Sequence, residues 1–272
     1  MAATQAAAAA TEPATTAGPS PAAGSATPAV LLDEVSKSFR GHAGPVLDRV
    51  SIRVEPGEFV SLVGASGCGK STLLSIIAGL EEPTSGTVSV AGDGAALMFQ
   101  EPALFPWLTA GRNVELALRL RGLGRRERRE RTRELLHLVR LDEAHDRRPH
   151  ELSGGMRQRV ALARALGQQR EVLLMDEPFA ALDAITRDVL HEELVRIWAE
   201  TGVAVVFVTH NVREAVRLGQ RVLLLSSRPG RVAREWAIDI PGERRIESPA
   251  VSALSTEITH HLREEIVRHG RH

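Results

Sequence analysis

A glycine-rich segment at Gly64–Thr72, with the sequence GASGCGKST, constrains the fold of this chain more than any other feature. It directly follows an apolar run at Phe59–Val63 and precedes a stretch rich in Leu and Ile. Glycines allow the backbone conformations that a tight turn between two regular elements requires. A strand, a glycine-rich turn and a helix in this order indicate an α/β domain built on a parallel sheet.

The spacing inside this segment is that of a phosphate-binding loop. Gly64, Gly69, Lys70 and Ser71 match the pattern GxxxxGK followed by Ser or Thr. Amides of such a loop point inward, and the start of the following helix adds the positive end of its dipole. Lys70 can reach the terminal phosphates, and the Ser71 hydroxyl can bind Mg²⁺. The predicted nucleotide-binding residues are Gly64, Ala65, Ser66, Gly67, Cys68, Gly69, Lys70, Ser71 and Thr72.

Cys68 is the only cysteine in the chain, so no internal disulfide can form. Without a cysteine cluster, a bound metal would be held by oxygen atoms. The alternative for this segment is a ligand-free turn, but such a turn does not need Lys and Ser in register. We expect bound nucleotide to slow the alkylation of Cys68, because the surrounding backbone would contact phosphate.

Apolar runs of two kinds follow one another from Val30 onward. Three alternating runs predict a small antiparallel layer with one exposed face, at Val30–Phe39, Val46–Val54 and Thr87–Ala91. Five nearly continuous apolar runs predict parallel strands covered on both faces, at Phe59–Val63, Ala95–Phe99, Val172–Met175, Val203–Val208 and Val222–Leu225. The predicted fold class is therefore α/β with a mainly parallel sheet and a small antiparallel β layer.

Composition divides the chain into a leader and one domain. Residues 1–29 are rich in Ala, Pro and Thr and lack large apolar residues after Met1, so we expect a disordered leader. Residues 30–272 form the predicted domain. Within it, residues 101–168 lie between two predicted sheet strands and have mainly helical patterns, which indicates an inserted helical subdomain.

Two helices of this domain have recognisable faces. Asp183 is a candidate N-cap and Gly202 a candidate end for the first helix. Its expected apolar face contains Ile185, Val189, Leu194, Ile197 and Trp198. The second helix closes the chain, and its expected apolar face contains Leu254, Ile258, Leu262 and Ile266.

Polar residues follow three of the apolar runs at the edge where the glycine-rich loop lies. They are Gln100, Asp176 with Glu177, and Thr209 with His210. Ligands of open α/β sheets bind outside the carboxyl ends of the strands, so we expect these side chains to meet there. Asp176 suits Mg²⁺, Glu177 could polarise an attacking water, and His210 could contact the γ-phosphate. The alternatives are a buried salt bridge for Asp176, a helix cap for Glu177 and a structural role for His210.

The segment LSGGM at Leu152–Met156, followed by RQRVALARAL at Arg157–Leu166, resembles the signature of ABC transporter ATP-binding subunits. The last signature residue is Met156, where the family commonly has Gln. Together with the P-loop, VLLMDE ending at Glu177, and His210, the resemblance covers about residues 30–272. It implies a P-loop NTPase fold of the ABC ATPase type, with ATP and Mg²⁺ as ligands.

The resemblance also implies roles for individual residues. In the family, the signature of one subunit closes over ATP held by the P-loop of another, which implies a homodimer. Ser153, Gly154, Gly155 and Asp183 would then contact the partner's nucleotide site, and Phe39 would stack on adenine, where Tyr is commoner. The implied catalytic residues are Glu177, His210, Lys70 and Gln100, and the implied metal-binding residues are Ser71, Gln100 and Asp176.

The segment Glu101–Val114 is a candidate docking site for a membrane subunit. It places Leu104, Phe105, Trp107 and Leu108 among two prolines, and the alternative is that they form subdomain core. This segment, with DEPFAALDAITR and SSRPGRV, is similar to importer ATPases for nitrate, alkanesulfonates and taurine. That similarity implies permease subunits, an external solute-binding protein, and a peripheral position at the cytoplasmic face of the membrane.

Charge and hydropathy exclude other classes of function. The 34 basic and 34 acidic residues balance, so we expect no binding to nucleic acid. The arginine run at Arg125–Arg133 is spaced for i,i+4 ion pairs, Glu127 with Arg131 and Arg126 with Glu130, which indicates a solvated helix face. No apolar run approaches the roughly 18 residues that a membrane span needs. An exporter ATPase, a soluble ABC ATPase and a P-loop kinase are the alternatives to an importer ATPase.

Overall fold

The structure is a computed structural model, and it describes residues 27–41, 44–241, 244–245 and 248–269. Its larger sheet has 6 strands. In spatial order these are β5 (Ala95–Met98), β6 (Val172–Asp176), β7 (Ala204–Val208), β3 (Phe59–Gly64), β8 (Arg221–Leu225) and β9 (Val232–Ala237). The first five are parallel, as the continuous apolar runs predicted.

The edge strand β9 was not predicted from the sequence. It pairs antiparallel with β8, and Trp236 is its one buried residue. A strand with so little buried surface gives almost no apolar periodicity, so only its pairing with β8 defines it.

The smaller sheet is antiparallel, with the order β2-β1-β4, as predicted. Its strands are β1 (Val30–Lys37), β2 (Leu47–Val54) and β4 (Ser85–Val90). Ala29 is buried, donates its N–H to the Val54 carbonyl and accepts from the Ala91 N–H. The ordered domain therefore includes Ala29, which the sequence analysis assigned to the leader. Residues 1–26 of that predicted leader lie outside the described residues.

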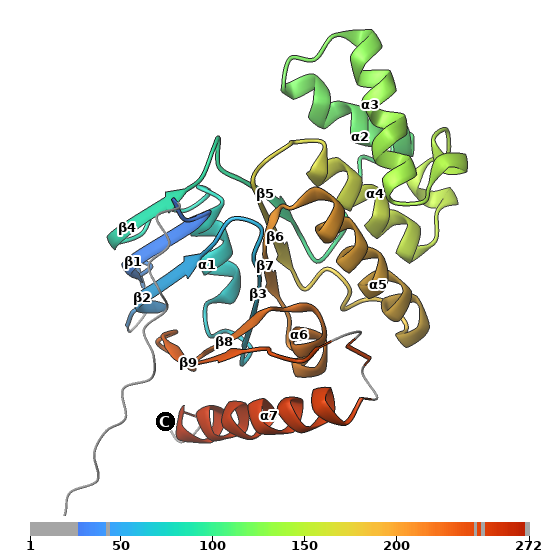
Figure 1. The fold of residues 1–272 in the computed structure, drawn as a ribbon. Helices are drawn as coiled ribbons and strands as arrows, with labels where there is room; N and C mark the ends of the chain where they lie inside the picture. The colour runs from blue at the N-terminus through green and yellow to red at the C-terminus, as the bar shows by residue number, and fades with distance from the viewer. Residues whose placement is uncertain (1–26, 42–43, 242–243, 246–247, 270–272) are drawn as a thin grey trace, which may run out of the picture.

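The strands of the larger sheet are apolar throughout because both of their faces are covered. In β7, Val205 and Phe207 pack into one core cluster, whereas Ala204, Val206 and Val208 pack into another. The second cluster includes helix α1 (Lys70–Ile77) and the smaller sheet, and Figure 1 shows α1 between the two sheets. A strand with two buried faces loses the alternation seen in the smaller sheet.

Helices make up most of the chain between β5 and β6. They are α2 (Ala110–Leu120), α3 (Arg125–Leu138) and α4 (Gly154–Leu166), with short 3₁₀ turns at Asp142–Ala144 and Pro149–Glu151. Figure 1 shows α2 and α3 projecting from the end of the sheet, while α4 contacts β5. On α3 the arginine run pairs Arg131 with Glu134 and Arg128 with Glu115, partners that differ from those the spacing predicted.

Helix α5 (Ala184–Thr201) has the predicted ends but a different buried face. The Asp183 carboxylate accepts the Thr186 N–H at 2.9 Å, and Gly202 ends the helix with φ 62°. Leu194 and Ile197 are buried as predicted, but Ile185 is 80% exposed and Val189 is exposed. The buried face continues through Leu190 instead, which packs into the same core cluster as Leu194 and Ile197.

Phe99 also departs from the sequence analysis. The strand β5 ends at Met98, and the Phe99 side chain is exposed rather than covered on both faces. The apolar run is longer than the strand, because the chain leaves the sheet before the run ends.

Two further helices, α6 (Val212–Leu218) and α7 (Pro249–His269), complete the fold. They pack against each other, and Figure 1 shows α7 running beside α6 and the β8–β9 edge. Ile258 is buried, Leu254 and Leu262 pack on the same cluster, and the Trp236 indole donates to Glu257 at 2.9 Å. Ile266, predicted on the same face, is exposed. No helix of the described part of the chain has the length and apolar character needed to cross a membrane.

The two isoleucines of α7 provide a matched test of this packing. Ile258 is 0% exposed and Ile266 is 45% exposed. We expect Ile258→Ala to lower the free energy of unfolding by about 2–5 kcal/mol, because it leaves a cavity under the helix. Ile266→Ala should change it by less than about 0.5 kcal/mol. Urea denaturation of both variants measures the difference, and equal losses would contradict the docking of α7.

Candidate functional site

The loop between β3 and α1 depends on two glycines with positive φ. Gly67 has φ 73° and Gly69 has φ 102°, values that strain a residue with a side chain. A Cβ at Gly69 would also lie 2.6 Å from Cδ2 of Leu47. These two positions therefore require glycine, and they form the turn that precedes the first residue of α1.

Lys70 is the first residue of α1, and its side chain bends back along the loop. Its ammonium donates to the carbonyl oxygens of Gly64 at 2.9 Å and Ala65 at 3.0 Å. The side chain is buried. The loop therefore holds a positive charge at a fixed place beside its own backbone.

One cavity brings together residues from four separate parts of the chain. It has a volume of about 380 Å³. Its lining consists of Val46, Ser66, Gly67, Gly69, Lys70, Ser71, Thr72, Glu177 and His210. The residues after β6 and β7 thus meet the glycine-rich loop at the carboxyl edge of the sheet, where the sequence analysis expected them.

Glu177 and His210 contact each other at this cavity. Nδ1 of His210 lies 2.8 Å from a carboxylate oxygen of Glu177. Glu177 has φ 45°, and its N–H donates to the Val208 carbonyl at 2.9 Å, which ties the turn after β6 to the end of β7. The His210 side chain is 65% exposed, so Glu177 is its main anchor within the described part of the chain.

Asp176 lies at the end of β6, next to the Ser71 hydroxyl. Burial raises the pKa of the Asp176 carboxyl above its ordinary value. The hydrogen bond with Ser71 and the charge of Lys70 oppose this rise in pKa, and the charge of Glu177 adds to it. A half-buried carboxylate beside a hydroxyl at a phosphate-binding loop is a site that favours a cation.

Several predicted residues lie outside this cavity in the described chain. Gln100 follows β5 at the same edge, but its side chain is exposed and its backbone carbonyl accepts from Gln158 at 2.9 Å. Phe39 is half-buried, with the Lys37 ammonium 4.9 Å from its ring centre. Neither residue lines the cavity.

The signature segment Ser153–Gly155 forms the start of α4 and packs against the start of α5. The Ser153 hydroxyl accepts the Met156 N–H at 3.2 Å as an N-cap. A Cβ at Gly155 would lie 2.8 Å from Cγ2 of Thr186. The nearby Asp183 is exposed, and its hydrogen bond with Thr186 lowers the pKa of its carboxyl. The signature and Asp183 thus lie in a second place that does not line the cavity, with Ser153 and Asp183 exposed and Gly155 buried.

Comparison with known proteins identifies the family. The sequence model described as "ABC transporter" matches residues 47–180. The chain is 47% identical to the nitrate import ATP-binding protein NrtD of Synechocystis sp. over 221 residues, which is 78% of this chain and 83% of that protein. It is also 47% identical to the taurine import ATP-binding protein TauB of Burkholderia pseudomallei over 252 residues, 88% and 97% of the two chains.

The chain belongs to the ABC transporter family. Its fold is similar to the dimeric structure of a bacterial ABC transporter cassette, with a TM-score of 0.68 and 35% identity over 78% of this chain and 100% of that one. A dimeric cassette in a post-hydrolysis state, bound to ADP and Pi, matches with a TM-score of 0.67 at 35% identity and the same coverage. The protein is therefore an ATP-binding ATPase with the P-loop NTPase fold.

Some residues at the cavity of this ABC ATPase were missed by the sequence analysis. Val46, the residue directly before β2, lines it, and the Arg228 guanidinium lies against Gly67. Gly230 donates its N–H to the Val46 carbonyl at 2.8 Å. Val46 reads as an ordinary strand residue and SSRPGRV as a plain loop, so nothing in their local sequence indicates that they pack on the P-loop.

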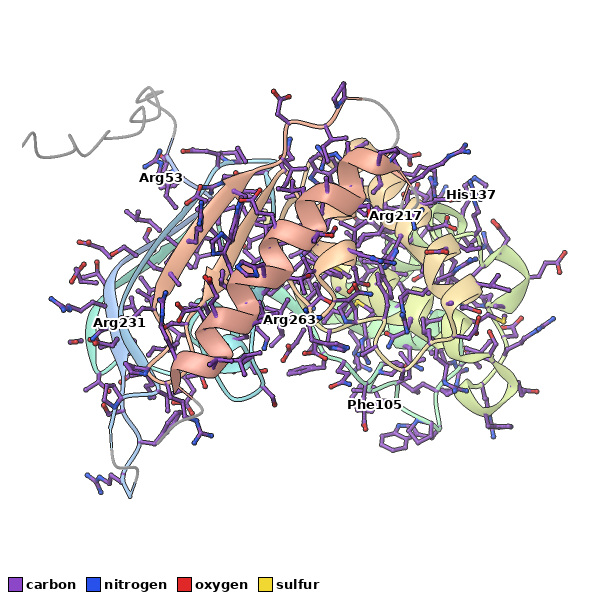
Figure 2. All side chains as sticks on the ribbon, turned by 90° about the horizontal axis from the view of Figure 1, so that it is seen from below. Arg53, Phe105, His137, Arg217, Arg231 and Arg263 are labelled. Atoms are coloured by element: carbon purple, nitrogen blue, oxygen red, sulfur yellow. The ribbon has the colours of Figure 1, made fainter. Side chains whose placement is uncertain are left out.

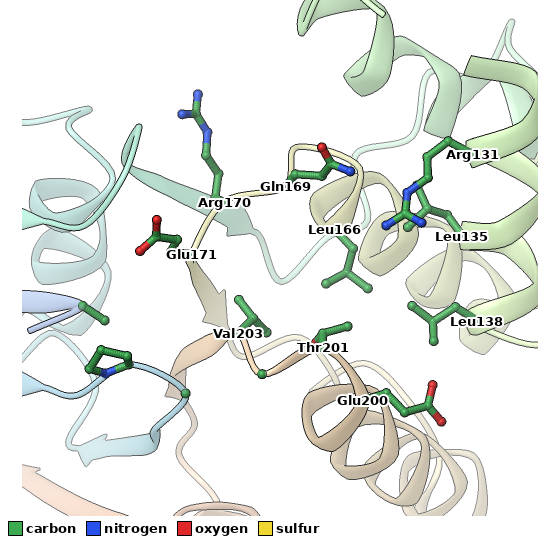
Figure 3. A pocket seen from close by; sticks show the side chains of 14 residues that line it. Arg131, Leu135, Leu138, Leu166, Gln169, Arg170, Glu171, Glu200, Thr201 and Val203 are labelled. Atoms are coloured by element: carbon green, nitrogen blue, oxygen red, sulfur yellow. The ribbon is translucent and has the colours of Figure 1, made fainter. Parts of the chain in front are cut away.

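A second cavity lies at the opposite edge of the sheet. It has a volume of about 470 Å³ and is lined by residues that precede β3, β6 and β7, together with residues of α3, α4 and α5. Figure 3 shows Leu135, Leu138 and Leu166 at its apolar side and Arg170 and Glu171 at its polar side. It contains none of the predicted nucleotide-binding residues.

The ABC ATPase presents two aromatic rings on the segment between β5 and α2. Trp107 is 68% exposed, and its ring centre lies 5.4 Å from that of Phe105, which Figure 2 shows projecting outward. The Asn113 side chain accepts from the Phe105 N–H at 2.8 Å, and Arg164 of α4 donates to the Ala103 carbonyl at 2.7 Å. A fixed backbone therefore holds the exposed rings, while Leu104 packs against the core.

Cys68 faces the core beneath the loop. Its side chain is buried, and burial raises the pKa of its thiol, although Lys70 opposes the shift. Because alkylation requires the thiolate, we expect iodoacetamide to label the native ABC ATPase slowly at pH 7, and faster as the pH rises beyond the pKa of an ordinary thiol. Mass spectrometry of timed samples measures the rate.

Urea-unfolded protein is the control for this labelling, because its thiol is exposed and has an ordinary pKa. Labelling of the native protein as fast as the unfolded protein at pH 7 would contradict the buried thiol. The sequence analysis expected bound nucleotide to slow the alkylation of Cys68. Because protein already covers the native thiol, we expect bound ATP to slow this alkylation only slightly further.

Proposed function

We propose that this chain is the ATP-hydrolysing subunit of an ABC importer for a small solute of the nitrate, sulfonate or taurine type. The observation that carries the proposal is the single cavity lined by Lys70, Ser71, Glu177 and His210. Its relatives named for nitrate import and taurine import support the direction and the solute class. An ABC exporter ATPase and a soluble ABC ATPase are the alternatives.

In this proposal, each group at the site has a separate task. The loop amides from Gly64 to Thr72 and the Lys70 ammonium bind the phosphates. The Glu177 carboxylate orients and polarises the attacking water at the outermost phosphate. Nδ1 of His210 donates a hydrogen bond to the Glu177 carboxylate, and the other ring nitrogen, Nε2, is left to face the γ-phosphate region, where it would need an N–H because phosphate oxygens only accept.

Ser71 and Asp176 fit a Mg²⁺ ion in this proposal. They offer a hydroxyl and a carboxylate side by side, which are the hard oxygen donors that Mg²⁺ prefers. The raised pKa of Asp176 also fits, because a nearby cation compensates the burial of its carboxylate. When bound, Mg²⁺ would neutralise charge on the phosphates. Gln100 stays a predicted metal contact, since its side chain is not among the residues that line the cavity.

We infer that the working unit is a homodimer. The signature residues Ser153, Gly154 and Gly155 and the exposed Asp183 lie outside the cavity of their own chain, and Ser153 at the start of α4 is exposed. Their free helix start at α4 can bind an anion supplied from another molecule. The dimeric ABC cassettes that share this fold support the same arrangement. In this dimer, Phe39 of the P-loop chain would stack on adenine.

The exposed rings of Phe105 and Trp107 are the proposed contact with a permease subunit. Aromatic rings on a fixed backbone are the kind of anchor that interface pockets receive. This contact would place the ATPase at the cytoplasmic face of the membrane as a peripheral subunit. An external solute-binding protein would complete the importer, and the transported solute would contact those partners rather than this chain.

Glu177→Gln tests the hydrolytic role. We expect it to retain ATP binding and lower kcat by at least about 100-fold, because a general base contributes about 10²–10⁴. Phosphate release and fluorescent-nucleotide titration of the purified protein measure the two quantities. Size-exclusion chromatography with ATP should also show more dimer for this variant.

Lys70→Ala is the complementary variant. It should weaken ATP binding by about tenfold or more, since hydrogen bonds to charged groups contribute about 1.5–3 kcal/mol. Normal turnover of Glu177→Gln, or unchanged ATP affinity of Lys70→Ala, would refute the assigned site.

Trp107→Ala tests the proposed docking contact. We expect it to keep the ATP affinity of the wild type and to lose permease from the co-purified complex, because the ring lies outside the nucleotide cavity. Leu120→Ala is the matched control, since Leu120 is an exposed apolar residue at the last position of α2. Full retention of the permease by Trp107→Ala would contradict this contact.

A further inference from the structure

A buried pair of ionisable side chains lies behind the nucleotide cavity and is not part of it. His191 of α5 and Glu214 of α6 are both buried, and Nε2 of His191 lies 2.5 Å from Oε1 of Glu214. A buried carboxylate is costly unless charged or polar partners compensate it. The neighbours of His191 and Glu214 therefore indicate what this pair does.

The Thr209 hydroxyl also donates a hydrogen bond to the Glu214 carboxylate. Thr209 is the residue directly before His210 and is buried. Its hydroxyl oxygen accepts the Asn211 N–H at 3.0 Å, and its own N–H donates to the Leu62 carbonyl of β3 at 3.2 Å. The Thr209 hydroxyl thus links Thr209 to Asn211, the residues on either side of His210. Glu214 fixes this hydroxyl by accepting its hydrogen bond.

His191 connects this arrangement to the segment that follows Glu177. Its ring lies edge-on to the Phe179 ring, with centres 5.5 Å apart. Phe179 lies in the turn that follows Glu177. The Ala180 N–H closes this turn by donating to the Glu177 carbonyl at 3.2 Å. The pair His191–Glu214 therefore touches both segments whose side chains meet at the cavity.

The groups around His191 specify its hydrogen bonds. An Arg217 guanidinium nitrogen lies 3.4 Å from Nδ1 of His191 and 2.9 Å from an Asp188 carboxylate oxygen. Because a guanidinium can only donate, Nδ1 accepts, and Nε2 carries the proton that it donates to Glu214. Both oxygens of the Glu214 carboxylate then have a donor, one from Thr209 and one from His191.

We propose that Thr209, Glu214 and His191 are positioning residues that hold the His210 backbone so that its imidazole meets Glu177. The inference rests on the proposed function, because it concerns the geometry of the hydrolytic pair. It follows from the exposure of His210, whose ring has few neighbours to fix it. The backbone on either side of the ring must therefore supply the rigidity, and the Thr209 hydroxyl is the group that ties it down.

Thr209→Val removes this hydroxyl while keeping the shape of the side chain. In the purified full chain we expect kcat for ATP hydrolysis to fall about tenfold, because small misplacement of a catalytic group is costly, with KM and ATP affinity within about twofold of wild type. Thr209→Ser restores the hydroxyl and should restore most of kcat. Glu214→Gln, which keeps the side-chain shape, should also lower kcat without weakening ATP binding.

A double-mutant cycle with His210→Ala separates positioning from a purely structural role. If Thr209 acts through His210, then Thr209→Val should cause almost no further loss of kcat in a His210→Ala background. The inference is overturned if the two losses multiply, if Thr209→Val leaves kcat unchanged, or if Thr209→Ser fails to restore it. Melting temperatures of all variants identify losses that come from unfolding.

The same measurements keep the two proposals apart. A wild-type chain that binds no ATP, or a Glu177→Gln variant with normal turnover, would refute the proposed function itself. An active wild type with the expected Glu177→Gln defect, together with an unaffected Thr209→Val variant, would refute only the positioning role.

Discussion

The site depends on the close approach of backbone at the turn between β3 and α1. Gly67 and Gly69 adopt positive φ there, and a side chain at Gly69 would collide with Leu47 of the smaller sheet. The turn directs loop amides and the start of a helix toward one point, to which Lys70 adds a positive charge. The parallel sheet gives this point its chemistry, because both of its faces are buried and the carboxylate and imidazole groups follow the carboxyl ends of β6 and β7.

The second requirement is that acidic and imidazole groups be held beside this turn without being buried. Glu177 and His210 follow two neighbouring strands, β6 and β7, and their side chains meet at 2.8 Å. The largely exposed His210 ring depends for its position on residues beneath it. Thr209, Glu214 and His191 form that support in the core, where the low dielectric strengthens hydrogen bonds. Binding groups thus lie on the loop, and the groups that fix the hydrolytic geometry lie behind it.

Sequence patterns predicted what depends on local spacing. The P-loop at Gly64–Thr72, the parallel strands and the Asp183 cap of α5 were predicted because each requires particular residue types at short, fixed intervals. Errors arose where burial depends on distant elements. Ile185 and Phe99 are apolar but exposed, and β9 was missed, since coverage by another layer rather than periodicity decides these cases. The contacts of Val46 and Arg228 at the cavity could not be predicted for the same reason.

The sequence by itself determined the fold class, the family resemblance and the polar residues at the strand ends, because these are properties of residue type and spacing. Only the tertiary structure decided which of these residues share a cavity. It brought Lys70, Ser71, Glu177 and His210 together and placed Ser153–Gly155 and Asp183 elsewhere. It alone linked His191 to Glu214, since these residues belong to separate helices and no local spacing relates them. Contacts between distant segments arise from the packing of whole elements, which short patterns do not encode.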